Sequence, residues 1–296
     1  MRWDDMRIFL AVARGESLSS AGKGLRLDPA TIGRRVARLE EDLGVVLFGK
    51  SPKGYALTDE GQKLVAHAMR VEQQFELARE DVRAEAGQLT GQIRIGAPDG
   101  CANYILPQVT ADIVDQNPGL EVQIVALPRL FNLSKREADM AIAVSLPPTG
   151  RLVAQKITDY RLHLAASQHY LDSHGPIHTA ADLSGRRVVG YIPDMIHDRE
   201  LDYLGSIGIE AVGLASNSVS VQLNWLRQSA GVGIVHDFAM PSAPGLRRVL
   251  AHEISLKRAF YLVRHADDRR LERLNRFAAL LAQGVRAEVE RLEAEA

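Results

Sequence analysis

Hydrophobic residues that follow Asp28 recur at the spacing of an α-helix. Ile32, Val36 and Leu39 follow one another at intervals of four and three, so they share one helical face. Asp28 is suited to cap this helix, because its carboxylate can accept from free N–H groups of the first turn, and Pro29 suits the first helical position. The opposite side carries mainly polar and charged residues, namely Thr31, Arg34, Arg35 and Arg38. The pattern predicts a helix with one face on a core and the other offered outward.

The outer face of this helix has two interpretations. An arginine fork fits phosphate oxygens and the O6/N7 edge of guanine, so the face suits the major groove of DNA. With Glu40 and Glu41 following, it is also compatible with an ordinary solvated surface. The flanks favour DNA: residues 6–13 predict a first helix that closes a three-helix core. Residues 50–58 predict a short β-hairpin, or wing, carrying Lys50 and Lys53. Together these segments predict a winged helix-turn-helix.

Positions spread over residues 3–67 form a wider pattern: Met6 to Phe9, Val12-Ala13, Ser17-Leu18, Ala21, Leu25, Leu27, Ile32, Arg34, Val36, Leu39-Glu40, Leu43-Gly44, Leu47-Phe48, Leu57-Thr58 and Gly61. In spacing as well as in residue type, this segment resembles the DNA-binding domain of LysR-type transcriptional regulators. The chain departs from the family at Asp28-Pro29, where Ser-Gln is usual, and at Gly33, where Ser is common; Lys50 and Lys53 stand where Arg is usual. The resemblance implies a DNA-binding winged helix-turn-helix over residues 1–62, and the departures leave the details of base readout open. The residues expected to contact DNA are Thr31, Arg34, Arg35, Arg38, Lys50 and Lys53.

Residues 63–90 form a linker with its own pattern. Apolar or small residues alternate at spacings of four and three, a period of 3.5 that is typical of a coiled-coil seam. A helix packed on the core of a monomer is the alternative. The resemblance implies that this helix dimerises, as it does in the family, and that further assembly into tetramers is common. A dimer would read a two-fold-related operator in double-stranded DNA. The seam positions are Leu64, Ala68, Val71, Phe75, Ala78 and Val82.

From residue 91 onward strands and helices alternate, which predicts an α/β architecture with largely parallel sheets. Expected strands cover 93–96, 120–126, 138–144, 162–166, 187–191, 232–236 and 258–263, and expected helices cover 104–115, 219–228 and 268–293. The resemblance implies an effector-binding domain over 91–296, similar to periplasmic binding proteins. Its first lobe would hold 92–161 and 268–296, and its second 162–267. A small-molecule effector is expected in the cleft between the lobes.

Ligands of α/β sheets favour the carboxyl ends of strands, and this rule selects the candidate effector residues. Each has a plainer alternative: Asp99 can cap the next helix, Cys101 can be a small buried residue instead of a redox sensor, and Ser218 can be an N-cap. The candidates are Asp99, Cys101, Ser145, Asn217, Ser218 and His236.

Composition narrows the class of protein further. The 296 residues carry a net charge of −1, so DNA binding must come from the local concentration of Lys and Arg in the first seventy positions. A single cysteine excludes an intrachain disulfide and suits a reducing compartment. The chain starts without an apolar leader and contains no stretch of membrane-spanning length, which predicts a cytoplasmic protein without membrane contact.

Enzymatic chemistry has no recognisable motif in this chain. Gly-x-Ser-x-Gly, the phosphate-binding loop and His-Glu-x-x-His are all missing. His169, His174 and His178 lie close in sequence, but no cysteine or carboxylate completes a metal-ligand pattern, which favours solvated loop histidines. A plain ligand-binding protein is disfavoured by the N-terminal module. We therefore expect no catalytic residues, no metal and no cofactor, and RNA polymerase as a further partner.

Overall fold

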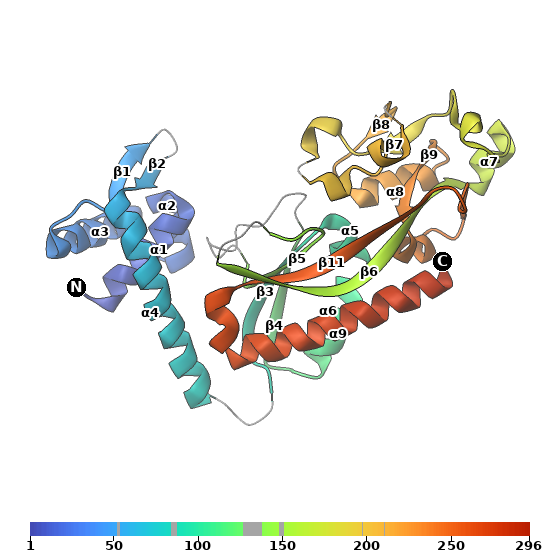
Figure 1. Cartoon of the computed structure of the whole chain (residues 1–296). Coiled ribbons are helices and arrows are strands. Elements are labelled where there is room, and N and C mark those ends of the chain that lie inside the picture. The colour runs from blue at the N-terminus through green and yellow to red at the C-terminus, as the bar shows by residue number, and fades with distance from the viewer. Residues whose placement is uncertain (52–53, 84–87, 127–137, 148–150, 197, 210) are drawn as a thin grey trace. The chain divides into compact units, whose positions relative to one another are not determined.

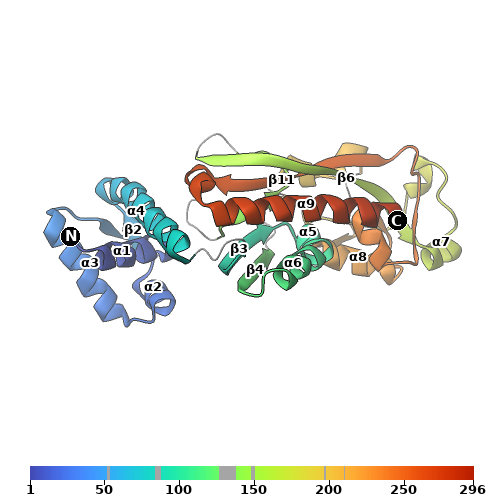
Figure 2. The same ribbon diagram turned by 90° about the horizontal axis from the view of Figure 1, so that it is seen from below.

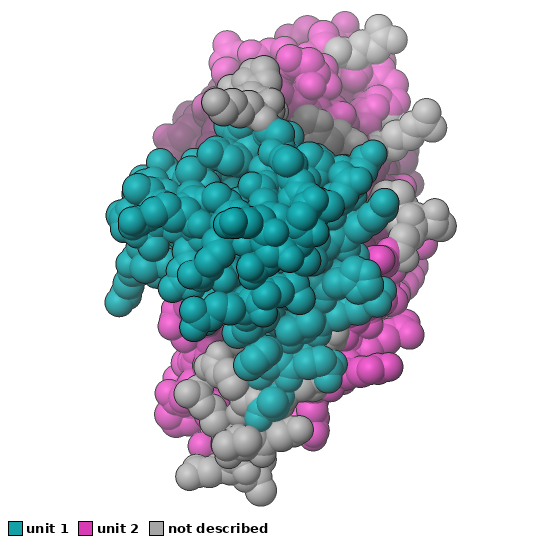
Figure 3. Space-filling model, turned by 90° about the vertical axis from the view of Figure 1, so that its left-hand side faces the viewer, with its two compact units in different colours: residues 1–87 teal, residues 88–296 magenta. Residues whose placement is uncertain are grey.

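Three short helices at the start of the chain each bury one face in a common core. In this computed structural model, residues 1–51, 54–83, 88–126, 138–147, 151–196, 198–209 and 211–296 are described. The chain divides into two compact units, residues 1–87 and 88–296, coloured teal and magenta in Figure 3. Unit 1 contains α1 (Trp3–Gly15), α2 (Leu18–Leu25), α3 (Pro29–Leu43), β1 (Phe48–Ser51), β2 (Gly54–Leu57) and α4 (Asp59–Arg83).

The core of unit 1 confirms the helical pattern of the sequence. Ile32, Val36 and Leu39 of α3 are buried against α1 and α2, together with Phe9 and Leu10 of α1. Burying these side chains supplies most of the stability of so small a unit, at about 1.5–3 kcal/mol for each large aliphatic residue. The helices therefore owe their stability mainly to packing on this shared core.

The predicted wing is present and is held against the helices by backbone contacts. β1 and β2 pair antiparallel with Phe48 opposite Leu57. The N–H of Tyr55 donates to the carbonyl oxygen of Glu16 at 2.9 Å, and Oε1 of Glu40 accepts from the N–H of Leu47 at 2.7 Å. The wing is thus fixed both to the loop after α1 and to α3.

The helix α4 uses its predicted seam in two ways. Leu64 and Ala68 pack on the core of unit 1 within the same chain, so the first part of the seam matches the monomer-core alternative. Val71 and Phe75 are exposed by 38% and 48%. One face of Phe75 stacks on Trp3 of the same chain, with ring centroids 4.6 Å apart. The apolar residues left for another surface begin at Val71.

Unit 2 is built on one curled sheet, in which two long antiparallel strands join two parallel blocks. Among the described residues the sheet has nine strands in the order β4-β3-β5-β11-β6-β9-β7-β8, with β10 pairing β6. Its strands are β3 (Gly91–Ala97), β4 (Leu120–Ala126), β5 (Met140–Ala143), β6 (Leu152–Ser167), β7 (Val188–Gly190), β8 (Leu214–Ala215), β9 (Val232–His236), β10 (Leu246–Arg248) and β11 (Ser255–His265). Its longer helices are α5 (Asp99–Tyr104), α6 (Leu106–Asp115), α7 (Gln168–His174), α8 (Val219–Arg227) and α9 (Glu272–Glu295).

The two parallel blocks define two lobes of unit 2. Lobe 1 is built on β3, β4 and β5, and lobe 2 on β7, β8 and β9; β6 and β11 run through both (Figure 1). Figure 2 shows α9 lying along these two long strands. The prediction of largely parallel sheets is therefore right for each lobe and wrong for the strands that join them, since β6 pairs antiparallel with β11 and with β9.

Candidate functional site

The outer face of α3 presents one arginine between small side chains. Ala30, Arg34 and Ala37 lie at intervals of four and three and are all exposed. Oδ1 of Asp28 accepts from the N–H of Thr31 at 2.8 Å, and Nη2 of Arg34 donates to Oγ1 of Thr31 at 3.1 Å. The hydroxyl and the backbone N–H of Thr31 hold the pKa of Asp28 below its usual range. The helix start is therefore capped as predicted, with Arg34 projecting beside it.

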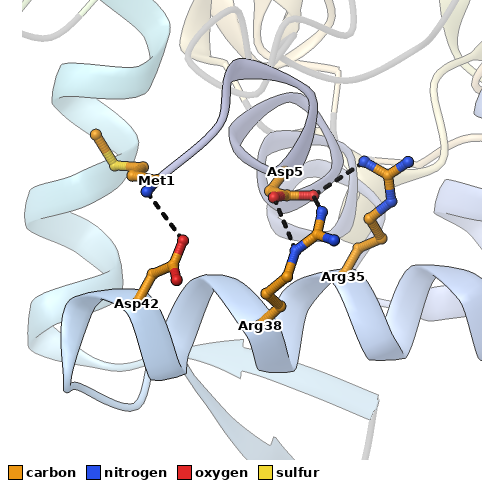
Figure 4. A network of polar contacts seen from close by, with 5 residues as sticks. All are labelled: Met1, Asp5, Arg35, Arg38 and Asp42. Atoms are coloured by element: carbon orange, nitrogen blue, oxygen red, sulfur yellow. Dashed lines mark hydrogen bonds and ion pairs between the residues drawn. The ribbon is translucent and has the colours of Figure 1, made fainter.

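Arg35 and Arg38 have an intramolecular partner that the sequence pattern did not reveal (Figure 4). Nη1 of Arg35 donates to Asp5 at 3.0 Å, and Nε of Arg38 donates to the other carboxylate oxygen at 3.1 Å. Asp5 itself is fully buried on α1. Burial raises the pKa of Asp5, but the hydrogen bonds and charges of Arg38 and Arg35 outweigh it and leave the pKa below its usual range. These two arginines therefore hold α3 on α1, which distinguishes them from Arg34.

The two lysines of the wing are only partly placed. Lys50 lies in β1, opposite Tyr55 of β2. Lys53 lies outside the described residues. The hairpin geometry is present, and the contacts of these lysines with DNA stay a prediction.

In unit 2, Asp99 connects the two lobes. It begins α5 of lobe 1, but its carboxylate does not cap that helix. Oδ2 of Asp99 accepts from Oγ of Ser218 at 3.0 Å, from N of Ser220 at 3.0 Å and from Oγ of Ser220 at 3.3 Å. Ser218 is the N-cap of α8 in lobe 2, since its Oγ accepts from the N–H of Val221. An anion at a helix N-terminus is favourable, so this contact, the Asp99 clasp, stabilises the junction of the lobes.

A second hydrogen bond between a serine and a carboxylate also joins the lobes, and here lobe 2 supplies the carboxylate and lobe 1 the serine. Oγ of Ser145, directly beyond β5 in lobe 1, donates to Oδ2 of Asp198 in lobe 2. The other oxygen of Asp198 accepts from the N–H of Glu200 at 3.0 Å. Asn217 lies half-buried before α8, next to Ser218. The structure thus brings Asp99, Ser145 and Ser218 to one lobe junction, as the strand-end rule predicts.

An aromatic cluster joins the strands β6, β9 and β11 of the sheet. Tyr160 of β6 stacks on Phe260 of β11 at 4.2 Å and on His236 of β9 at 5.6 Å. The Tyr203 hydroxyl lies 3.3 Å from Nε2 of His236. Nδ1 of His236 has no hydrogen-bond partner among the described residues. Burial lowers the pKa of His236 to about 3, so the ring is neutral at physiological pH.

Cys101 belongs to the interior of lobe 1. It is 1% exposed and a free thiol, and burial raises its pKa far above the usual range. A reactive thiol needs exposure and a lowered pKa, so the plainer alternative for Cys101, a small buried residue, fits the structure.

Sequence reasoning missed Asp198 of the lobe junction, and Tyr160 and Tyr203 of the aromatic cluster. None stands at the end of a predicted strand. Asp198 and Tyr203 fall in a concentration of tyrosine and aspartate between positions 191 and 203, whereas Tyr160 lies outside it.

Comparison with known proteins agrees with this arrangement. Residues 3–62 match the bacterial regulatory helix-turn-helix domain of the lysR family, and residues 86–286 match the LysR substrate binding domain. The chain belongs to the LysR family. Within the part of this LysR-family chain that the structure describes, no helix is long and apolar enough to cross a membrane.

Similar proteins cover different parts of the chain. The transcriptional regulator PtxR of Pseudomonas aeruginosa is 29% identical over 183 residues, which are 62% of this chain and 59% of PtxR. The match thus spans about three fifths of that relative. The activator TtdR of Escherichia coli is 25% identical over a match that covers 77% of this chain and 75% of the TtdR chain.

Solved structures share the fold over nearly the whole chain. A full-length OxyR variant of Pseudomonas aeruginosa has a TM-score of 0.71 at 19% identity, covering 97% of this chain and 98% of that one. CrgA of Neisseria meningitidis has a TM-score of 0.56 at 22% identity, covering 99% of both chains. These likenesses support the combination of a winged helix-turn-helix with a two-lobed α/β domain.

Proposed function

We propose that this protein is a transcriptional regulator that binds a two-fold-related operator and responds to a small molecule at the lobe junction of unit 2. The observation that carries the proposal is the outer face of α3. Its opposite face is buried through Ile32, Val36 and Leu39, while Arg34 projects between Ala30 and Ala37. Small neighbours let the helix lie deep in the major groove, where Arg34 can pair with guanine.

The remaining basic residues are assigned to positioning. Arg35 and Arg38 hold Asp5, and their side chains remain 33% and 41% exposed, so their outer edges can reach backbone phosphates. Lys50 and Lys53 would reach phosphates from the wing. Thr31 stays with Arg34 at the base edges. Phosphate contacts fix the orientation of the protein, and base contacts supply specificity.

The direct experiment is footprinting of the full chain on the DNA upstream of its own gene, followed by selection from random duplexes. The proposal predicts a protected region with two related half-sites, and a selected sequence with the same symmetry. Folded protein that selects no sequence preference at low salt would contradict it.

We assign dimerisation to the exposed part of the α4 seam. Val71 is 38% exposed and its neighbours along the seam are apolar or small, as a coiled-coil partner requires. Val71→Glu should shift the protein toward monomer in sedimentation, whereas Gln62→Glu, which adds the same charge at an exposed position of α4, should not. Equal sedimentation of the two variants would exclude this surface.

The effector is proposed to bind where Asp99, Ser145, Asn217 and Ser218 meet, above His236 and Cys101. Because Asp99 already supplies an anion to the N-terminus of α8, an amine or hydrogen-bond donor suits the junction better than a carboxylate. A thermal-shift panel of amines and carboxylates of matched size tests this. If only carboxylates raised the melting temperature, and still did so in Ser218→Ala, the effector would bind elsewhere.

Transcriptional control implies two finer assignments, RNA polymerase as a partner and the cytoplasm as the compartment. In vitro transcription from the selected operator, with and without the protein, tests the first. An unchanged transcript level at saturating protein would count against it.

A further inference from the structure

Lobe 2 contains a cavity of about 250 Å³ that is separate from the lobe junction. It lies between the sheet and the segment that joins β7 to β8, yellow in Figure 1. The described residues of this segment form short turns at η3 (Pro193–Met195), η4 (Arg199–Leu201) and η5 (Gly205–Ile207). A covering layer made of short turns packs the sheet less completely than a continuous helix would, which leaves room beneath it.

The cavity has an apolar lining with aromatic edges. Val189 of β7 and Ile234 of β9 form its floor, and Leu204 and Val212 belong to its cover. Tyr191 and Tyr203 also line it, and their rings meet edge to face at 5.7 Å. Such walls favour a flat aromatic molecule, since ring edges and faces attract one another.

The charge of the lining excludes most metabolite acids. Among the described lining residues, the only charged side chain is the carboxylate of Asp202, and none is Lys, Arg or His. A carboxylate or phosphate ligand would therefore enter without a cation to pair with, at a high desolvation cost. An uncharged ligand has no such penalty.

The size fits one small ring system. An apolar cavity of roughly 150 Å³ holds a benzene molecule, so this larger cavity has room for a bicyclic aromatic. Asp99, Ser145 and Ser218 do not line it, and every described lining residue lies between positions 189 and 234 in lobe 2. We propose that this cavity is a second binding site, for a small uncharged aromatic molecule of about the size of indole.

A ligand at this site would also act on the lobe junction. Tyr203 forms a wall of the cavity and meets His236 through its hydroxyl. Asp198 begins the turn that carries Leu201, another lining residue, and bonds to Ser145 of lobe 1. A ligand that packs against Leu201 and Tyr203 would therefore also bear on the Ser145–Asp198 contact.

The test is calorimetric titration of the full chain with indole. We expect saturable binding with a Kd on the order of 0.1–1 mM, and no binding of benzoate in the same range. Val212→Phe, at a half-buried lining position, should fill the space and weaken indole binding at least tenfold. Ser218→Ala, at the lobe junction, should bind indole as the wild type does. Leu204→Ala enlarges the cavity and should admit carbazole, a tricyclic aromatic that exceeds the room for a bicyclic ring system in the wild type.

The outcomes separate the two sites. Indole binding that is lost in Ser218→Ala and kept in Val212→Phe would place the ligand at the lobe junction and overturn the proposal. Absence of saturable binding to folded wild type would also overturn it. If Val212→Phe does not fold, the carbazole titration of Leu204→Ala decides alone, because only an enlarged cavity explains a gain of carbazole binding.

Discussion

Removing Arg38 should destabilise unit 1 more than removing the carboxylate with which it pairs. Asp5 is fully buried, whereas Arg35 and Arg38 are 33% and 41% exposed. In Arg38→Ala the buried carboxylate keeps a single partner, Arg35. In Asp5→Ala both guanidinium groups can turn to water, so no charge is left buried.

The expected magnitudes follow from this asymmetry. Breaking a buried pair from one side costs about 3–5 kcal/mol, and the remaining bond from Arg35 reduces this to roughly 2–4 kcal/mol for Arg38→Ala. Asp5→Ala loses hydrogen bonds with exposed partners and should cost about 1–2 kcal/mol. The double variant should resemble Asp5→Ala, because the charge that made the first change costly is gone.

The chain offers a clean reporter for this comparison. It has two tryptophans, Trp3 in unit 1 and Trp225 in unit 2. In a Trp225→Phe background, urea unfolding followed by Trp3 fluorescence reports unit 1 alone. The folded-state pKa of Asp5 is lowered, so its pairing stabilises above the unfolded pKa and is lost as pH falls through the folded pKa. The penalty of Arg38→Ala should therefore shrink below about pH 4. A larger loss for Asp5→Ala than for Arg38→Ala at pH 7 would refute the reasoning.

Two further predictions concern unit 2. Asp99→Asn removes the charge of the Asp99 clasp and should lower the unfolding free energy of unit 2 by about 1–3 kcal/mol. Urea unfolding followed by Trp225 fluorescence in a Trp3→Phe background measures this loss. The matched change Asp112→Asn, at an exposed position, should have no effect, and equal effects of the two variants would show that the clasp contributes nothing. His236 has a folded pKa of about 3, below the unfolded value near 6.5, so the unfolded state binds the proton first and stability falls by about 1.4 kcal/mol per pH unit below pH 6.5. His236→Phe should remove that slope from urea midpoints between pH 7 and 5, and an unchanged slope would contradict the burial argument.

Local patterns predicted the elements whose cause is local. The cap of α3 gave its start, since Asp28 and Pro29 stand there as predicted; its end at Leu43, before Gly44, was not predicted. The strands at 120–126 and 232–236 were also placed correctly: the first alternates apolar and polar residues, and the second is a continuous run of buried residues. The last helix begins at Glu272 instead of 268, after a short turn whose residue Asp268 is buried.

The sequence could not reveal the elements and contacts that depend on residues far apart. The first half of β6, around Gln155 and Lys156, is exposed and polar, so it lacks the signal of a strand until its pairing with β11 is seen. Asp5 and Arg38 are separated by 33 positions, and Ser145 and Asp198 by 53. No helical or strand period reaches such distances. The strand-end rule did select Asp99, Ser145 and Ser218, which take part in contacts between the lobes, because topology places those ends together; their contact with an effector stays a prediction.

The central claim, that α3 reads DNA through Arg34, is tested most directly by affinities for the selected operator and for a random duplex of equal length. The account predicts that Arg34→Ala weakens operator binding by about 1–3 kcal/mol and leaves binding to the random duplex nearly unchanged. Arg70→Ala removes the same charge from an exposed position of α4 and should change neither the affinity for the operator nor the affinity for the random duplex. Equal losses of Arg34→Ala on both duplexes would show that Arg34 contacts only phosphate, and the assignment of base readout to this face would be wrong.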